Sequence, residues 1–502
     1  MTARQARDTS PDQADVVAFL LRPEVHGGAQ VRHIETHLSH LFLVGDRAFK
    51  MKKAVSWSMV DYATVERREH FCRKELGVNG PVAGALYIGV IPVTQGPSGL
   101  VMGGEGPPVE WLVEMRRFDD RSQLDQMVED GTLSDDIVDA TADAIAGMHR
   151  SAPIVSQSGA ADRALALAQQ LATDTAAQTI TTADEAAAAR RWLEKAREAI
   201  ARKADVIDRR ARHGFVRRCH ADLHLSNICM FEGRPTPFDA IEFSDEIATI
   251  DVLYDFAFVL IDLESHERAD LSARLLSRYL EWTRDYSGLA LLPLFLSLRA
   301  MVRALTGAAK GRSPATHITA ATRTLTGPAG VWLAAVGGLS GSGKSTVARA
   351  LGACSGAAVI RSDTARKHLF GVAPTERLSA SAYAPHVSER VYARMLQDAR
   401  RGLRAGWPMV TDATFMEPAS RERVAALAAR EGVPFVGAWL NVPSDVMRER
   451  VRRRRGDASD ADEAVVAAQE HRDLGRMDWH ELDGTAAPDE NAAEILKRAR
   501  TG

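Results

Sequence analysis

The sequence predicts two folds in one chain: an α+β fold with two lobes, followed by an α/β fold in which helices flank a parallel sheet. Three observations support this prediction. Short strand-like runs lie near the N-terminus, Ala-rich helical text follows them, and beyond residue 330 apolar strand-like runs alternate with amphipathic ones. The length of 502 residues also exceeds what one hydrophobic core usually organises.

A hairpin and the helix after it predict the first lobe. In residues 41–53 apolar positions alternate on either side of Gly45-Asp46, which is the pattern of two strands joined by a tight turn. Residues 61–76 have the spacing of a charged amphipathic helix. Two further apolar runs, 89–93 and 110–115, complete the strands of a β-rich lobe.

A stretch with helical periodicity and a stretch of small, polar residues predict the remaining domain boundaries. Residues 134–212 are Ala-rich and studded with charges, which predicts a larger helical lobe. From residue 306 the sequence turns small and polar and includes Pro314 and Pro328, as linkers do. The predicted parts are an N-terminal extension (1–29), a first domain (30–305), a linker (306–328) and a second domain (329–502).

Composition predicts a cytoplasmic protein. The N-terminus lacks the apolar core of a signal peptide, and the most apolar stretch, Leu289 to Leu298, is too short to span a bilayer and contains Pro293. The four cysteines lack metal-ligand spacing and are expected to be reduced. The formal net charge of -3 gives no electrostatic basis for binding nucleic acid or a membrane.

The most specific motif is a phosphate-binding loop that opens the second domain. Residues 338–345, GLSGSGKS, fit G-x-x-x-x-G-K-[ST] and lie between the strand-like VWLAAV and the helical STVARAL. Glycines let backbone N–H groups turn toward phosphates, and the helix start adds partial positive charge. We expect Lys344 to reach the β- and γ-phosphates of ATP and Ser345 to bind Mg²⁺. The predicted nucleotide-binding residues are Gly338, Ser340, Gly341, Ser342, Gly343, Lys344, Ser345 and Thr346.

Charged side chains follow the next two strands of this domain. Asp363 comes after an apolar run, and a carboxylate at the carboxyl end of a strand beside the loop faces the ligand. Asp363 is predicted to accept the proton of a substrate hydroxyl, and Arg366 to hold a substrate charge. The alternative is that Asp363 caps a helix. Asp412 ends another apolar run and suits a contact with Mg²⁺ or its water, unless it is an ordinary strand-end residue.

An arginine-rich run in helical text follows Pro443. One or two of these arginines are predicted to stabilise charge on a transferred phosphoryl group, and the others to be solvated. The run comprises Arg448, Arg450 and Arg452 to Arg455.

Together these features resemble the P-loop kinases of small substrates, a group that includes polynucleotide 5′-kinase and zeta-toxin-like kinases. The resemblance covers about residues 329–475 and includes the text Ser459-Asp460-Ala461. It implies that Asp363 is the general base and that Arg366 is its substrate-phosphate partner. The substrates of the group are too diverse for the motif to name one.

A second catalytic pattern lies in the first domain. His220 to Asn227 fits H-x-D-L-x-x-x-N, in which Asp222 would accept a hydroxyl proton and Asn227 would bind a metal ion. Residues 238–243, FDAIEF, follow at the distance expected for a second metal-binding carboxylate. Lys50 lies on the second strand of the early hairpin, where a lysine for the ATP phosphates belongs.

These residues resemble the aminoglycoside phosphotransferase and choline kinase superfamily over about residues 30–305. The resemblance implies a bilobal protein-kinase-like fold with ATP between the lobes. It makes Asp222 the catalytic base and Asn227 a Mg²⁺ ligand, and it implies that the hinge strand Glu114-Met115-Arg116 offers backbone groups to adenine.

Several assignments in the first domain stay open. The metal carboxylate is Asp239 or Glu242, the phosphate lysine is Lys50, Lys52 or Lys53, and its helical partner is Glu66, Glu69 or Glu75. Asp251 and Asp255 are expected to serve structure.

The predicted function is therefore that of a bifunctional kinase. Each domain would use ATP and Mg²⁺ and transfer the γ-phosphoryl group to a hydroxyl of a small molecule such as a sugar, an aminoglycoside or a nucleotide. The alternative is an ATP-binding regulator with an N-terminal pseudokinase and one active P-loop kinase, for which a nucleic-acid 5′-hydroxyl is a further candidate acceptor. A membrane or nucleic-acid partner is not expected, and the sequence leaves the oligomeric state open.

Overall fold

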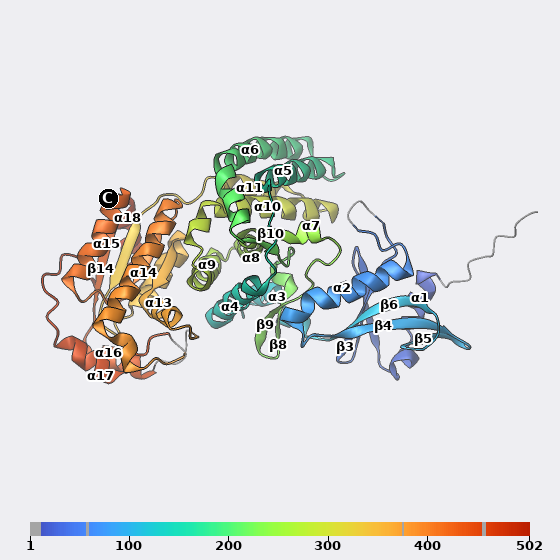
Figure 1. The fold of residues 1–502 in the computed structure, drawn as a ribbon, viewed down its shortest axis with the longest axis horizontal. Helices are drawn as coiled ribbons and strands as arrows, with labels where there is room; N and C mark the ends of the chain where they lie inside the picture. The colour runs from blue at the N-terminus through green and yellow to red at the C-terminus, as the bar shows by residue number, and fades with distance from the viewer. Residues whose placement is uncertain (1–11, 57–59, 374–375, 454–457, 502) are drawn as a thin grey trace, which may run out of the picture. The chain divides into compact units, whose positions relative to one another are not determined.

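The computed structural model describes residues 12–56, 60–373, 376–453 and 458–501 (Figure 1). The chain forms two compact units. Unit 1 comprises residues 1–133, 151–156 and 214–255, and unit 2 comprises residues 134–150, 157–213 and 256–502.

Unit 1 is organised around an antiparallel sheet of six strands in the order β1-β2-β3-β6-β4-β5. The strands are β1 (Val31–Glu35), β2 (Ser39–Val44), β3 (Arg47–Lys52), β4 (Tyr87–Gly96), β5 (Gly99–Met102) and β6 (Pro108–Arg116). The predicted hairpin is confirmed, since β2 pairs with β3 and Val44 lies opposite Arg47 across the turn. The two strands predicted around residues 89–93 and 110–115 are β4 and β6.

Helix α2 (Val65–Ala83) packs on this sheet. It begins four residues later than the predicted helix, because the hydroxyl of Thr64 caps it by accepting a hydrogen bond from the backbone N–H of Arg67. It also continues beyond Leu76. Its Cys72 is buried with Trp111 and Val113 of β6 in one hydrophobic cluster.

The predicted N-terminal extension is part of this lobe. It contains helix α1 (Gln13–Leu20) and the 3-10 helix η1 (Pro23–His26). Val16, Phe19 and Leu20 are buried in a cluster with Phe42 of β2 and Met51 of β3. These apolar side chains cover sheet surface that solvent would otherwise reach, so residues 13–26 belong to the fold and do not extend from it.

Two small antiparallel strand pairs complete unit 1 and hold the second catalytic pattern. β7 (Val216–Arg218) pairs with β10 (Thr249–Asp251), and β8 (Ile228–Phe231) pairs with β9 (Arg234–Pro237). The remaining elements are η2 (Asp120–Ser122), α3 (Leu124–Glu129), η3 (Leu225–Asn227) and α7 (Asp245–Ala248).

The helical text predicted for residues 134–212 is confirmed. It forms α4 (Asp135–Ser151), α5 (Ala160–Ala177) and α6 (Ala183–Arg212). Thr182 and Glu185 form a capping box that starts α6. The helices that follow are α8 (Val252–Ser265), α9 (Ala269–Thr283), η4 (Tyr286–Ala290), α10 (Leu292–Ala309) and α11 (Ala315–Thr324).

The segment predicted as a linker, residues 306–328, is largely helical. It holds the end of α10 and all of α11, whose Ile318 and Ala321 are buried. The hydroxyl of Ser297 on α10 donates to the carbonyl of Ala321 at 2.6 Å. Pro314 precedes the first turn of α11, a position that tolerates proline, so it marks a helix start. In the described chain α10 is also the one helix long and apolar enough to span a membrane, but 61% of that stretch is buried inside the protein.

The predicted parallel sheet is confirmed beyond residue 330. Its five strands run parallel in the order β12-β13-β11-β14-β15. They are β11 (Leu333–Gly337), β12 (Ala358–Arg361), β13 (Met409–Asp412), β14 (Phe435–Asn441) and β15 (His480–Asp483). Helices α12 (Lys344–Ser355) and α18 (Pro488–Thr501) bury Val347, Leu351 and Ile495 against one face of the sheet.

The other helices of this region surround the carboxyl ends of the strands or cover the second face (Figure 1). They are α13 (Ser362–Leu369), η5 (Ala380–Tyr383), α14 (Pro385–Arg404), α15 (Pro418–Glu431), α16 (Ser444–Arg453) and α17 (Glu463–Glu470). The predicted fold class, a bilobal kinase-like α+β part and an α/β part with a phosphate loop, is thus confirmed.

Candidate active sites

The loop between β7 and β8 in unit 1 is held in place by two anchors. Asp255 accepts the backbone N–H groups of His220 and Ala221 at 3.1 and 2.9 Å, in agreement with the structural role expected for it. The ring of His220 accepts the N–H of Asp222 at Nδ1, 3.3 Å away, and contacts the carbonyl of Phe238 through Nε2 at 2.8 Å. Burial lowers the pKa of His220, so the ring is neutral and braces the loop.

This anchoring brings Asp222 and Asn227 together. The side-chain amide of Asn227 donates to the backbone carbonyl of Asp222 at 2.9 Å and to its carboxylate at 3.1 Å. The Asp222 side chain is 41% exposed, and Nε2 of His224 lies 3.4 Å from its carboxylate. An accessible carboxylate next to an amide is suited to proton acceptance beside a metal ligand.

Lys50 and Lys52 of β3 share one carboxylate on α2. Two residues apart on a strand, they point to the same face, and their Nζ atoms donate to the two oxygens of Glu75 at 2.8 and 2.7 Å. Burial opposes ionisation of Glu75, but the two ammonium groups outweigh it and lower the pKa of Glu75 to about 2. Glu75 is therefore the helical partner that the sequence left open, whereas Glu69 pairs with Arg73 at the surface.

The two lysines differ in their second partner. Lys50 contacts Asp239, whereas Lys52 is fully buried and donates to Glu242 at 2.5 Å. The hydroxyl of Tyr62 also donates to Glu242 at 2.5 Å. Lys53 points elsewhere and pairs with Glu35 at 2.6 Å.

These contacts separate the two candidate metal carboxylates. The Asp239 side chain is 44% exposed, and the neighbouring Phe238 N–H donates to the carbonyl of Asn227 at 2.9 Å, which places Asp239 beside the catalytic loop. Glu242 is buried and already holds a lysine and a tyrosine hydroxyl. The geometry favours Asp239 as the metal ligand and a structural role for Glu242, and the metal role stays a prediction.

The backbone of Glu114 and Met115 differs from the expectation for adenine binding. Both residues lie in β6, with β3 paired on one side and β4 on the other. The groups of a strand between two neighbours serve the sheet ladder, so this backbone does not offer a free edge. The strand ends at Arg116, and the adenine role of this segment stays a prediction.

In unit 2 the phosphate loop has the backbone that its glycines permit. Gly341 and Gly343 have φ angles of 85° and 89°, and a Cβ on Gly341 would lie 2.5 Å from the carbonyl oxygen of Met447. Lys344 opens α12 and folds back over the loop, where its Nζ donates to the carbonyl of Leu339 at 3.4 Å. The N–H of Ser340 donates to the side chain of Gln469 at 2.8 Å.

A cavity of about 590 Å³ lies against this loop. Lys344, Ser345 and Thr346 line it from α12, and Asp363 lines it from α13. Its far wall is the turn of residues 484–488 between β15 and α18. The volume suits a nucleotide-sized ligand.

Asp412 and Ser342 fit a bound metal and phosphate. Asp412 is the last residue of β13 and lies opposite Val336, just before the loop. One carboxylate oxygen of Asp412 and the hydroxyl of Ser342 are buried and have no hydrogen-bond partner within the described chain. A buried, unsatisfied oxygen is costly, so both atoms suit partners that a Mg²⁺–nucleotide would bring. The second Asp412 oxygen lies 3.5 Å from Nε of Arg361.

Asp363 and Arg366 have different surroundings. Asp363 is in the first turn of α13, but Arg361 is the N-cap, so the capping alternative for Asp363 does not hold. Arg366 is buried, donates to the carbonyl of Ala382 at 2.6 Å and lies over the ring of Tyr383. These contacts do not place Arg366 at the cavity, so its role toward a substrate charge stays a prediction.

Three of the four arginines of the run that the structure describes form ion pairs. Arg448, Arg452 and Arg453 form ion pairs with Glu470, Glu463 and Glu449, respectively. Arg454 and Arg455 lie outside the described residues. Arg453 also lines the cavity, whereas Arg450 lines it and in addition donates to the carbonyls of Ser342 and Gly484 at 3.2 and 3.0 Å. Arg450 is the described arginine best placed to act on a bound phosphate.

Sequence reasoning missed several residues of these sites. Examples are Tyr62, Gln469 and the contact of the buried Lys367 with the partly buried Asp460, at 2.7 Å. Asp460 also accepts from the hydroxyl of Tyr383 at 2.6 Å. The partners in each contact lie far apart in sequence, so no local pattern could have linked them.

Comparison with known proteins identifies the two regions. Residues 110–292 match the model of the phosphotransferase enzyme family, and residues 333–472 match the model of an AAA domain family. Among solved structures, a choline kinase from Cryptosporidium parvum Iowa II covers 63% of this chain and 96% of its own, at 10% identity and a TM-score of 0.41. A gluconokinase from Sinorhizobium meliloti 1021 covers 34% of this chain and 94% of its own, at 20% identity and a TM-score of 0.25.

The relatives that match along the whole chain are mycobacterial. The uncharacterized proteins Rv2004c of Mycobacterium tuberculosis and Mb2027c of Mycobacterium bovis are each 32% identical over 496 residues, which cover 91% of this chain and 93% of theirs. The two kinase-like regions support phosphotransferase activity. The chain belongs to the family of these mycobacterial proteins and combines a phosphotransferase enzyme family region with a P-loop kinase-like AAA domain.

Proposed function

We propose that the chain is a bifunctional ATP-dependent phosphotransferase, in which each site transfers the γ-phosphoryl group of ATP to a hydroxyl of a small molecule in the cytoplasm. One observation carries this proposal. In each unit an accessible carboxylate, Asp222 or Asp363, lies in one site with oxygen atoms suited to Mg²⁺ and with a phosphate-binding lysine.

Bound Mg²⁺–ATP would supply the phosphoryl group and neutralise its charge. In unit 1, Lys50 would hold the phosphates, and Glu75 orients it through the 2.8 Å hydrogen bond. Asn227 and Asp239 would hold the metal, and Asp222 would take the proton of the acceptor hydroxyl.

In unit 2 the residues divide the same tasks differently. The N–H groups of residues 341–346 and Lys344 would bind the phosphates, and Arg450 would add charge beside them. Ser345 and Asp412 would hold the metal and its water. Asp363 would accept the proton of the second acceptor. In both sites positioning and charge stabilisation provide most of the rate enhancement.

The geometry weakens the pseudokinase alternative. Its motivation was that Glu242 replaces the usual metal-binding aspartate, but Asp239 is partly exposed and contacts Lys50, which supports Asp239 as the metal ligand. A nucleic-acid end kinase has less support too, since three arginines of the described run are paired with glutamates.

Labelled ATP and a panel of hydroxyl acceptors test the proposal on the full chain. We compare Asp222→Asn, Lys344→Ala and the double variant, with Lys497→Ala as a surface control on α18. Each single variant should lose the transfer that depends on its own site and keep the other. The double variant should lose both by at least about 10³-fold. Mg²⁺-dependent transfer that persists in the double variant would refute the assignment of the sites.

A further inference from the structure

Helix α9 lies in the phosphotransferase enzyme family region, yet within unit 2 it packs against the P-loop sheet. It runs beside β12, the edge strand of that sheet. An edge strand carries backbone N–H groups that the ladder does not use. The N–H of Val359 donates to the hydroxyl of Ser277 on α9 at 3.1 Å, and both residues are buried. Helix α9 thus provides, through the hydroxyl of Ser277, a hydrogen-bond acceptor for an N–H group on the open edge of the sheet.

One turn further along α9, Glu281 reaches the start of α13. Residues four apart share a helix face, so Glu281 follows Ser277 toward the same strand. The hydroxyl of Thr364 donates to the Glu281 carboxylate at 2.9 Å. Thr364 is 1% exposed and Glu281 9%. Thr364 directly follows Asp363, the candidate proton acceptor of the unit 2 site.

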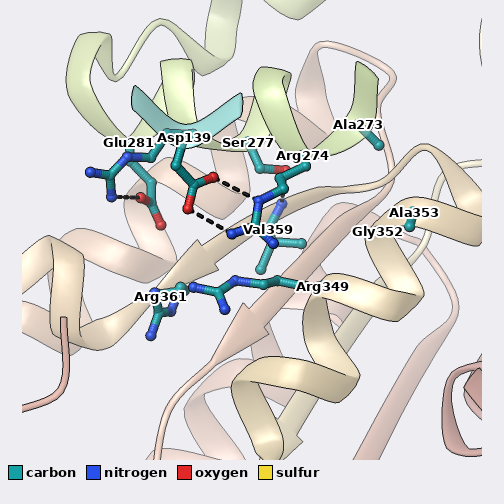
Figure 2. Close-up of a pocket in the computed structure, with 11 residues that line it drawn as sticks. Asp139, Ala273, Arg274, Ser277, Glu281, Arg349, Gly352, Ala353, Val359 and Arg361 are labelled. Atoms are coloured by element: carbon teal, nitrogen blue, oxygen red, sulfur yellow. Dashed lines mark hydrogen bonds and ion pairs between the residues drawn. The ribbon is translucent and has the colours of Figure 1, made fainter. Parts of the chain in front are cut away.

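The Glu281 carboxylate is itself held in position (Figure 2). Arg278 donates to its second oxygen at 3.2 Å. Arg278 in turn makes two hydrogen bonds, of 2.6 and 2.8 Å, to Asp143 on α4. The result is a fixed chain of contacts from α4 through α9 to the first turn of α13.

The space beside these contacts is too small to be a substrate site. A cavity of about 30 Å³, lined by Arg349 and Arg361 on one side and by Glu281 on the other, has room for a few water molecules (Figure 2). Helix α9 and strand β12 therefore pack directly against each other, and α9 acts here by holding the strand in place.

We infer that Ser277 and Glu281 are positioning residues of the P-loop site, through which α9 fixes the turn that carries Asp363. Neither residue lines the nucleotide cavity. They set the end of β12 and the first turn of α13, so that the Asp363 carboxylate stays at the cavity. The inference rests on the proposed function of the unit 2 site.

The test uses the full chain with Asp222→Asn, so that ATP turnover reports on unit 2. Thr364→Val and Glu281→Met keep the side-chain size but remove the hydrogen bond. Thr364→Ser and Glu281→Gln keep a donor and an acceptor. Asp270→Asn, at an exposed position near the start of α9, is the control. Mg²⁺–ATP turnover, nucleotide Kd and thermal unfolding are measured for each.

We expect Thr364→Val and Glu281→Met to lower kcat by about 10- to 100-fold, with nucleotide Kd changed less than about twofold, because the displaced group is a carboxylate and not the phosphate loop. Thr364→Ser and Glu281→Gln should retain most of the activity. The double variant Thr364→Val with Glu281→Met should lose less than the product of the two single losses, since the Thr364–Glu281 bond is removed only once.

Two outcomes would overturn the inference. One is an unchanged kcat in Thr364→Val and Glu281→Met. The other is a parallel loss of nucleotide binding and kcat, which would mean general unfolding. If the Asp222→Asn parent shows no turnover that Lys344→Ala removes, the proposed function fails separately. Amide hydrogen exchange of residues 362–366 then decides: faster exchange in Thr364→Val supports the positioning contact, and unchanged exchange refutes it.

Discussion

At the scale of single residues, the clearest feature of unit 1 is that two lysines on one strand have different roles. Lys50 and Lys52 share Glu75, but only Lys50 contacts the partly exposed Asp239, while Lys52 is buried between Glu75 and Glu242. A lysine that reaches a partly exposed carboxylate, here the proposed metal ligand, can exchange it for phosphate. A lysine enclosed by two buried carboxylates serves stability.

Substitution should separate these two roles. Lys50→Met should remove unit 1 transfer, measured in a Lys344→Ala background, and change stability modestly. Lys52→Met removes the ammonium partner of the buried Glu242 and one of the two ammonium partners of Glu75, which costs about 3–5 kcal/mol in the free energy of unfolding. Urea denaturation measures this cost. Equal stability of the two variants would contradict the different roles of Lys50 and Lys52.

The low pKa of Glu75 also makes a pH-dependent contribution to stability. Its folded pKa of about 2 lies below the ordinary value of 4.5, so the unfolded state binds a proton more readily. The stabilisation is complete above about pH 5 and should be lost as pH falls from about 4.5 toward 2. Unfolding free energies at several pH values should fall less steeply in Glu75→Gln than in the parent. Glu69→Gln on the same helix is the control and should keep the slope.

At the scale of elements, loops and helix ends decide where the chemistry lies. The phosphate loop approaches the backbone of α16 so closely at Gly341 that a Cβ has no room. Helix α1, which the sequence analysis assigns to an extension, supplies apolar side chains to the unit 1 sheet. Its Gln13 also donates to the carbonyl of Lys52 at 2.7 Å and accepts from the N–H of Ala54 at 2.8 Å, which fixes the strand end beside the lysine pair.

The close approach at Gly341 predicts a site-specific effect of alanine. Gly341→Ala places a Cβ 2.5 Å from the Met447 carbonyl, so the loop or α16 must shift, and nucleotide affinity in unit 2 should fall by at least about tenfold. Gly356→Ala is the matched control. It also has a positive φ, of 73°, but open space around it, so it should cost only about 1 kcal/mol of stability and leave affinity unchanged. Isothermal titration with Mg²⁺–ATP distinguishes the two.

The core role of α1 predicts different costs at adjacent leucines. Leu20 is fully buried, and Leu20→Ala should destabilise unit 1 by about 2–5 kcal/mol, because it leaves a cavity against β2 and β3. Leu21 is 39% exposed, and Leu21→Ala should cost less than about 0.5 kcal/mol. Urea unfolding measures both. Similar costs would mean that α1 does not pack as described.

At the scale of the whole molecule, the two kinase-like regions are not two separate bodies. The compact units divide the phosphotransferase region itself, and its helix α9 shares unit 2 with the P-loop sheet. Ser277, Glu281 and Arg284 of this region all contact the P-loop region, and Arg284 makes two hydrogen bonds of 2.7 and 2.8 Å to Asp398 on α14. The predicted boundary at residue 329 therefore separates segments whose side chains pack against each other.

This sharing predicts that the second region is weakened alone. A fragment of residues 329–502 exposes the Val359 edge and leaves Asp398 without Arg284. It should unfold at a temperature lower by roughly 5 °C or more than unit 2 in the full chain. Thermal unfolding of both, followed with and without Mg²⁺–ATP, measures the difference. Equal stability would show that α9 is dispensable.

Local patterns in the sequence determined the elements and the motifs. The hairpin at Gly45, the strand–loop–helix at residues 333–355 and the catalytic loop around Asp222 depend on neighbours within a few residues, and the structure has all three. The start of α2 differs from the prediction because the hydroxyl of Thr64 caps the helix. This cap outweighs the amphipathic pattern of the residues before it.

What the sequence by itself determined, then, is the fold class, the phosphate loop and the carboxylates that follow the strands, because backbone preferences and side-chain periodicity act over short distances. Only the tertiary structure decided that Glu75 serves both lysines, that Lys50 contacts Asp239, and that Glu281 accepts a hydrogen bond from Thr364, the residue after Asp363. These pairs are joined across 23 to 189 positions of sequence. At such separations burial and complementary charge determine which residue is the partner, and neither can be predicted from the local sequence.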